Sequence, residues 1–255
     1  MYIVSLTTTP FRFGNLYQTV DSLLRQSIVP DQIVINIPKQ YNLRMENLKI
    51  SEDSIKAFLE HYANKNHIVM VNEIEKDYGP GTKLLGIVKN FDNTEEDIYL
   101  VLVDDDMIYK PYMLEHFDTF RRLKEKEEME MVDVASYYVY DKNNILIGQG
   151  ADGFFIRWKC LSDFLRYFEI FENEDYLLYH DDYYISFYFH LLQKKIHRID
   201  TPDYELIYTQ NISSDIFALH KMEGKYNRSC LNQKCFEILT DLDQNKRAFE
   251  FLHQK

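Results

Sequence analysis

The first half of the chain alternates short, continuous apolar segments with stretches in which apolar residues recur at helical spacing. The continuous segments lie at 2–6, 32–37, 67–71 and 98–103. All four predict strands, and the unbroken apolar run at 98–103, rich in Val and Leu, predicts one that is buried on both faces of a parallel sheet. Apolar positions from Leu16 to Leu24 have helical spacing, and helices are also expected at 51–62 and 84–91. This half therefore predicts β-α-β crossover units.

The second half of the chain has a mixed pattern. It predicts strands at 132–140, 145–147, 154–158 and 196–199, and helices from Pro111, at 161–171, at 183–195 and at 232–253. The first two of these strands read as an antiparallel hairpin around the turn at 141–144. No repeat, low-complexity tract or linker divides the chain. We therefore expect one α/β domain over residues 1–255.

Three consecutive carboxylates follow the apolar run at 98–103. Buried parallel strands deliver ligand-contacting residues at their carboxyl ends. Asp104 and Asp106 are two residues apart, so on an extended backbone their side chains share a face. Such a pair suits Mg²⁺ or Mn²⁺, which prefer oxygen ligands. The alternative is an acidic helix N-terminus, where carboxylates favour the positive end of the helix dipole.

The bulk composition narrows the classes of function. The 255 residues are 45% hydrophobic, which indicates a globular protein with a sizeable core. The formal net charge is −12. A chain this acidic is not expected to bind a nucleic-acid backbone over a broad surface. An anionic substrate would need a metal, a helix N-terminus or a few well-placed basic residues.

Cysteine usage and the first residues bear on the compartment. The three cysteines, at 160, 230 and 235, form no C-x-x-C pair, which argues against a disulfide framework and a zinc site. No basic start with a long apolar region and no apolar run near 18 residues is present. We therefore expect no transmembrane segment and a cytoplasmic location.

Two further stretches carry polar residues at the edges of predicted elements. Asp77 to Lys83 reads DYGPGTK and precedes a predicted helix. It lacks the order of a P-loop, and a plain strand-to-helix turn is the simpler interpretation. His180-Asp181-Asp182 precedes the helix at 183–195. One aspartate there could be a helix cap, but a cap needs only one.

These motifs, in this order, resemble the GT-A glycosyltransferases, small soluble members of which occur in bacterial surface-glycan loci and large DNA viruses. The resemblance rests on SLTTTPFRFGNLYQTVDSLLRQ, on KDYGPGTKLLG followed by VLVDDDMIY, and on HDDYYIS, and it covers roughly residues 3–221. It implies a Rossmann-like fold with a mixed, mainly parallel central sheet flanked by helices. It also implies a nucleotide-sugar-binding half at 1–110 and an acceptor-binding half at 111–255.

The resemblance implies roles on the donor side. Asp106 would bind the metal directly, and Asp104 would contact the ribose or reach the metal through water. Asp105 would point away on an extended backbone and hydrogen-bond locally beside the donor. The remaining donor-side candidates are Thr7, Thr8 and Arg12 at the nucleotide, Asp77 at the base or ribose, and Lys83 at phosphate or sugar. An internal salt bridge for Arg12 and a surface charge for Lys83 are the alternatives.

The resemblance also implies roles on the acceptor side. Asp182 would be the general base, with Asp181 the next candidate. Asp152 would hold the donor sugar or acceptor hydroxyls, and Trp158 would stack on a sugar or pack in the core. His220 lies where many family members bring a histidine to the metal.

The expected activity is metal-dependent transfer of a sugar from a nucleoside diphosphate sugar to a hydroxyl of a glycan or glycoconjugate. UDP is the expected nucleotide, and an aspartate base favours inversion. A nucleotidyltransferase or phosphohydrolase that uses the same carboxylates is one alternative. A non-catalytic module that binds sugar nucleotides is another. The acidic pair at 181–182 favours a transferase, because binding alone needs no second carboxylate centre.

Overall fold

The computed structural model describes residues 1–43, 45, 47–90, 98–151, 153–200, 208–211 and 227–244, with side chains at all of these except 128, 208–211 and 243–244. Seven strands of this part of the chain form one sheet, in the order β10-β6-β9-β4-β1-β2-β3. Four neighbouring parallel strands make up half of it: β1 (Tyr2–Thr7), β2 (Gln32–Pro38), β3 (Val69–Ile74) and β4 (Tyr99–Leu102). These are the strands that the four apolar runs predicted.

The other half of the sheet contains its antiparallel strand. β9 (Phe154–Arg157) runs antiparallel to both β4 and β6 (Val134–Ser136), and β10 (Ile196–Arg198) is parallel to β6. The start of β9 therefore lies at the same edge as the end of β4, with Phe154 paired to Leu102. The residues before β9 and those after β1 and β4 meet at this edge.

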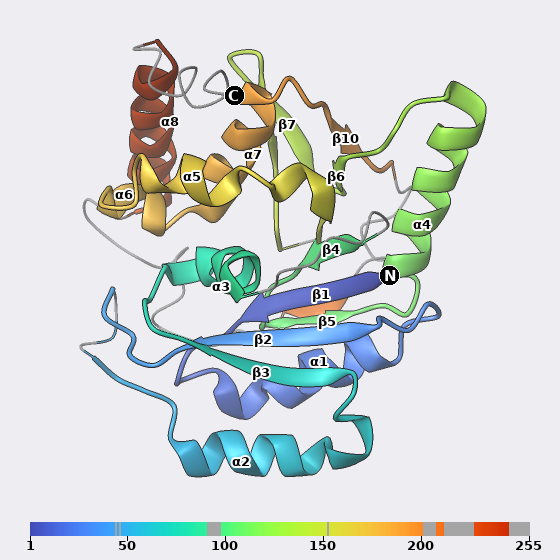
Figure 1. The fold of residues 1–255 in the computed structure, drawn as a ribbon, viewed down its shortest axis with the longest axis vertical. Coiled ribbons are helices and arrows are strands. Elements are labelled where there is room, and N and C mark those ends of the chain that lie inside the picture. Colours follow the sequence, from blue (N-terminus) through green and yellow to red (C-terminus); the bar gives the residue numbers. More distant parts are fainter. Residues whose placement is uncertain are drawn as a thin grey trace.

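Helices cover both faces of the sheet (Figure 1). One face packs on α1 (Leu16–Leu24), α2 (Glu52–His61) and α4 (Met113–Leu123). The other packs on α3 (Thr82–Asn90), α5 (Phe164–Glu169), α6 (Asp175–Leu178), α7 (Asp181–Leu191) and α8 (Arg228–Gln244). Neighbouring residues of a strand belong to opposite cores, as Ile3 and Val4 do. Burial on both faces is the reason β4 is apolar without interruption.

Two small antiparallel pairs stand outside the main sheet. β7 (Val139–Lys142) and β8 (Ile145–Gly148) form the predicted hairpin, whose turn has positive φ angles at Asn143 and Asn144. β5 (Met107–Tyr109) pairs with β11 (Tyr208–Asn211), a pair that local pattern did not predict. The strand expected at 132–140 is divided into β6 and β7, and the helix expected at 161–171 begins as the 3₁₀ segment Trp158–Leu161.

The architecture confirms the expected α/β class with a mixed, mainly parallel sheet flanked by helices. The three cysteines are free thiols, as their spacing predicted. Across the described residues, no helix combines the length and the apolar character that crossing a membrane requires.

Candidate active site

The carboxyl-end edge of the sheet carries a cavity of about 380 Å³. It is bounded by the loop after β1, the glycine loop before α3, the aspartates after β4 and the start of α7. Apart from Trp158, all of the sequence candidates that the structure describes line it: Thr7, Thr8, Arg12, Asp77, Lys83, Asp104, Asp105, Asp106, Asp181 and Asp182. Asp152 and His220 lie outside the described residues. Three motifs far apart in sequence are thus brought to one site.

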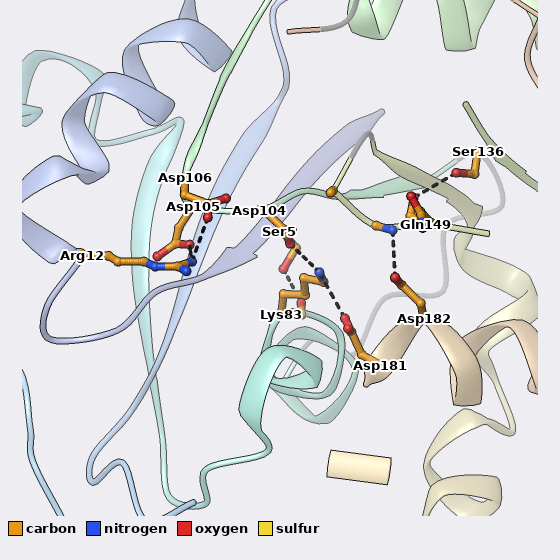
Figure 2. A network of polar contacts seen from close by, with 12 residues as sticks. Ser5, Arg12, Lys83, Asp104, Asp105, Asp106, Ser136, Gln149, Asp181 and Asp182 are labelled. Carbon is orange, nitrogen blue, oxygen red and sulfur yellow. Dashed lines mark hydrogen bonds and ion pairs between the residues drawn. The ribbon is translucent and has the colours of Figure 1, made fainter. Parts of the chain in front are cut away.

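Arg12 holds two of the three consecutive aspartates. Its Nη1 lies 2.8 Å from Asp105 Oδ1 and 3.2 Å from Asp106 Oδ2 (Figure 2). The backbone turns at 105–106 instead of remaining extended, so the side chains do not alternate as expected. Asp105 is buried and reaches a partner 93 residues away, so the prediction of a local hydrogen bond is wrong. We call Arg12, Asp105 and Asp106 the strand-end cluster.

Lys83 joins the aspartates after β4 to the acidic start of α7. Its ammonium Nζ lies 2.7 Å from Asp104 Oδ1 and 3.1 Å from Asp181 Oδ2 (Figure 2). The side chain is only 3% exposed, so the alternative of a surface charge is wrong. We call Lys83, Asp104 and Asp181 the bridging cluster. It is the direct contact between the two acidic motifs.

The charges of the bridging cluster support one another. Burial opposes the charge on Lys83, but Asp104, Asp181 and Asp182 hold the pKa of its ammonium well above the usual range. Burial likewise opposes ionisation of Asp104, but the charge and hydrogen bond of Lys83 hold the pKa of that carboxyl below its usual value. Both groups therefore carry full charge at neutral pH.

The glycine loop sets the position of Lys83. Gly79 has a φ of +59°, and a Cβ there would lie 2.3 Å from the carbonyl oxygen of Leu178. A Cβ on Gly81 would lie 1.6 Å from the hydroxyl of Tyr184 in α7. Only glycine allows this close approach. The stretch that reads as a plain turn in sequence therefore docks α3 directly against α6 and α7.

A ladder of buried polar side chains fixes the backbone at Lys83. The hydroxyl of Ser5 in β1 donates to the carbonyl of Lys83. The amide of Asn36 in β2 donates to that hydroxyl at 2.8 Å, and Asn72 in β3 donates to the Asn36 side-chain oxygen at 2.8 Å. These bonds satisfy polar groups in the core and attach the first turn of α3 to three strands.

Asp181 and Asp182 lie inside the first turn of α7, and neither is its N-cap, which is His180. Asp182 accepts the backbone N–H of Gly150 at 2.8 Å through Oδ1. Among the described residues it makes no ion pair of its own, because Lys83 pairs with Asp181. Burial, with the charge of Asp181, raises the pKa of Asp182 from the ordinary 3.8 to about 8. Asp182 is thus the carboxyl group whose proton exchanges near neutral pH.

The threonine loop and Asp77 contribute differently. The hydroxyls of Thr8 and Thr9 are buried at the cavity and meet no hydrogen-bond partner among the described residues. Thr7 donates its hydroxyl to the Asn36 carbonyl at 2.8 Å. Asp77 accepts the backbone N–H groups of Gly79 at 2.8 Å and Leu43 at 3.1 Å. Thr8 and Thr9 therefore keep donors for a ligand, whereas Asp77 braces the loops around it.

Sequence analysis missed several residues that line the cavity. Tyr41 donates its hydroxyl to the Thr8 carbonyl at 2.8 Å, and Tyr179 donates to the Leu43 carbonyl at 2.7 Å. Gln149 comes from the loop before β9, and Arg228 begins α8. No local pattern marks Tyr41, Tyr179 or Arg228. For Gln149, the glycine-rich stretch GQGADG at 148–153 was the available signal.

Two aromatic residues considered from sequence are structural. His180 faces the cavity, but its Nε2 is 2.7 Å from the side-chain oxygen of Asn232, and burial lowers its pKa to about 4. Its ring is neutral at physiological pH. Trp158 packs against the core on the α3 face, and its backbone N–H donates to Ile98, at the opposite edge from the aspartates.

The carboxylates after β4 provide the oxygen donors that a divalent ion prefers. Asp105 Oδ2 is buried without a hydrogen-bond partner in the described part of the chain, and Asp104 and Asp106 line the same cavity. Across these residues, no group of three or more Asp, Glu, His or Cys side chains is already arranged to hold a metal. The donor chemistry fits Mg²⁺ or Mn²⁺, and binding would exchange the ion pairs to Lys83 and Arg12 for the metal.

The sequence matches no family model and no curated protein. Among solved structures, residues 1–349 of S. aureus TarS in complex with UDP superpose with a TM-score of 0.51 at 16% identity, over 81% of this chain and 59% of that chain. The complex with UDP-GlcNAc gives 0.50 at 16% identity, over 100% and 76%. This chain thus spans less than two thirds of TarS in the first alignment.

The cytidylyltransferase IspD of Francisella tularensis gives a TM-score of 0.41 at 11% identity, over 92% of this chain and 98% of that chain, which is too low to carry an argument. The strand order, the layers and the match to TarS agree on one architecture. The chain therefore has a GT-A-like fold.

Proposed function

We propose that this protein is a glycosyltransferase that moves a sugar from a nucleoside diphosphate sugar, with UDP as the nucleotide, to a hydroxyl of a glycan or glycoconjugate. One observation carries the proposal. Two carboxylate centres of different character line a single cavity: a charged one after β4 and a protonatable one at the start of α7. Glycosyl transfer needs both, because a diphosphate must leave and an acceptor hydroxyl must lose a proton.

The residues of the first half serve the donor. Thr8 and Thr9 line the cavity, and their buried hydroxyls, which have no partner among the described residues, would hydrogen-bond to the nucleotide. Arg12 and Lys83 are the cations that face the diphosphate. Mg²⁺ or Mn²⁺, held by Asp104 and Asp106, would supply Lewis-acid stabilisation of the leaving group. This division assigns residues 1–110 to the donor and residues 111–255 to the acceptor.

Asp182 serves as the general base. Asp181 is ion-paired to Lys83, so it positions the lysine. Asp182 lacks such a partner, and its raised pKa makes it the stronger base. It takes the acceptor proton while the acceptor oxygen bonds to the anomeric carbon. The bond from that carbon to the diphosphate breaks, and the nucleoside diphosphate leaves with the electron pair.

Binding and turnover test the proposal separately. Thermal shifts with UDP, GDP and Mn²⁺ measure nucleotide binding, and donor hydrolysis by wild type, Asp106→Ala and Asp182→Ala measures chemistry. We expect metal-dependent UDP binding that Asp106→Ala weakens, and hydrolysis that Asp182→Ala abolishes without loss of UDP binding. Equal nucleotide binding by Asp106→Ala would refute the donor site. UDP binding without turnover would indicate a binding module, and cleavage of a nucleotide without a sugar would indicate a phosphohydrolase.

A further inference from the structure

A second pocket adjoins the main cavity on the other side of Asp182. Its volume is about 450 Å³, and it shares His180, Asp182, Gln149 and Arg228 with the main cavity. The remaining lining comes from the β7–β8 hairpin region and from helices α7 and α8, through Tyr138, Tyr140, Lys142, Tyr183 and Asn232. Asp182 borders both pockets, so it can take a proton from a molecule in the second pocket while that molecule reacts with one in the main cavity.

The walls of this second pocket are amphipathic. The rings of Tyr138 and Tyr140 have centroids 5.9 Å apart, and the hydroxyl of Tyr140 lies 3.2 Å from that of Tyr183. Tyrosine combines an apolar ring face with a polar tip. Such a surface suits a sugar, which has apolar C–H faces and hydroxyl edges.

The charge in the second pocket is cationic. Lys142 Nζ donates to the Tyr183 hydroxyl at 3.0 Å and to the Asn232 carbonyl at 3.1 Å, and it lies 4.8 Å from the centroid of the Phe236 ring. Within the described ranges, no carboxylate pairs with this ammonium, and burial lowers its pKa. An anion at this place would supply the missing counter-charge.

A second positive charge lines this pocket. Arg228 is exposed at the start of α8 and makes no hydrogen bond or ion pair with the described residues. His180 is neutral at physiological pH, and Asp182 lies at the border with the main cavity. Two cations thus face one pocket in a chain whose formal net charge is −12. A local reversal of charge on an acidic protein indicates an anionic ligand.

We propose, on the basis of the glycosyltransferase function above, that the second pocket is the acceptor subsite and binds a sugar carrying an anionic group, a carboxylate or a phosphate. Lys142 and Arg228 bind this group, and the tyrosines pack against the ring. A hydroxyl of the same sugar then faces Asp182. Its oxygen bonds to the anomeric carbon of the donor, its proton passes to Asp182, and the nucleoside diphosphate leaves. The substrate class thereby narrows from any glycan to an acidic one.

Matched sugars that differ only in charge test this assignment. Methyl glucoside, methyl glucuronide and glucose 6-phosphate are titrated by calorimetry at pH 7 into the protein with UDP and Mn²⁺. We expect one of the two charged sugars to bind about tenfold or more tightly than the neutral one, since charge-assisted hydrogen bonds are worth this much. Tighter binding of methyl glucuronide identifies the group as a carboxylate, and tighter binding of glucose 6-phosphate identifies it as a phosphate.

Two variants and a control locate the effect. Lys142→Gln and Arg228→Gln should each remove most of the preference for the charged sugar. Lys195→Gln removes the same charge from an exposed lysine before β10, at the opposite edge of the sheet, and should keep the preference. Equal binding of neutral and charged sugars overturns the inference, as does a preference that survives both pocket variants. Inorganic phosphate that binds as tightly as glucose 6-phosphate also overturns it.

The proposed function is measured independently through UDP binding. Loss of UDP binding with an intact charge preference would refute the donor assignment and leave the anionic-sugar pocket standing. UDP binding without any preference for the charged sugar would refute the anionic-sugar pocket and leave the donor assignment standing.

Discussion

The strand-end cluster and the bridging cluster contain the same kinds of groups but distribute their cations differently. In the strand-end cluster, Arg12 lies within ion-pair distance of both Asp105 and Asp106. In the bridging cluster, Lys83 pairs with Asp104 and Asp181, and the adjacent Asp182 receives only a backbone N–H. Both carboxylates of the pair Asp105–Asp106 therefore have a cation. In the pair Asp181–Asp182, the lysine pairs with Asp181 alone.

This difference separates two chemical roles. Carboxylates that share a cation stay charged and suit the binding of a metal or the bracing of a site. A buried carboxyl group without a cation has a raised pKa and can accept a proton near neutral pH, as Asp182 does. Under the proposed function, the position of one buried lysine decides which of the two aspartates in α7 would be the base.

The largest effect should come from removing the protonatable carboxyl group. Asp182→Asn keeps the oxygen that accepts the Gly150 N–H but cannot take a proton. We expect kcat for glycosyl transfer to fall about 10²–10⁴-fold, the usual contribution of a general base. UDP affinity, measured by calorimetry, should stay unchanged. A fall confined to UDP affinity would place Asp182 in donor binding instead.

The two cations should differ in their contribution to stability. Lys83→Met leaves Asp181 without its partner in the interior and removes the cation from Asp104, which is 33% exposed. Breaking a buried ion pair in this way costs about 3–5 kcal/mol. Arg12→Met removes a partner that is 18% exposed, so we expect a smaller loss of about 1–3 kcal/mol. Urea unfolding of the two variants gives both values. Equal losses would contradict the distinction between the clusters.

The raised pKa of Asp182 should appear in the pH dependence of stability. The folded state retains a proton up to about pH 8, whereas the unfolded chain releases it near the ordinary 3.8. Stability attributable to this group therefore falls as the pH rises between these values. Asp182→Asn abolishes that loss, so its Tm should exceed that of wild type by more at pH 8 than at pH 5. Each kcal/mol relieved raises Tm by about 2–4 °C. A constant difference in Tm across this range would show that Asp182 has an ordinary pKa.

The smallest effect concerns the packing of α7 against the glycine loop. The Tyr184 hydroxyl is buried beside Gly81 and has no hydrogen-bond partner among the described residues. Tyr184→Phe should therefore stabilise the protein by about 1 kcal/mol, because it removes an unsatisfied polar group. Tyr167→Phe is the matched control, since its hydroxyl donates to the Tyr184 carbonyl at 3.0 Å and its loss should destabilise by a similar amount. Denaturant titration compares the two; a loss of stability in Tyr184→Phe would indicate that its hydroxyl has a partner.

Much of the architecture follows from local sequence. The four largely apolar runs specify parallel strands, and the unbroken run at 98–103 specifies a fully buried one, because alternation disappears when both faces of a strand are covered. Asp104 to Asp106, placed directly after such a run, had to emerge at the carboxyl-end edge of the sheet. The β5–β11 pair, by contrast, joins residues about 100 positions apart, and no local period marks it.

The sequence by itself singled out residues that line the cavity: the three aspartates after β4, the acidic pair before Tyr183, and a lysine after a glycine loop. Only the tertiary structure decided their roles. Contact between Lys83 and Asp181 depends on Gly79 and Gly81, which let α3 approach α6 and α7. The charge on a carboxyl group is set by its burial and by the cations around it. Those cations come from distant parts of the chain, so the distinction between Asp181 and Asp182 arises only when the chain folds.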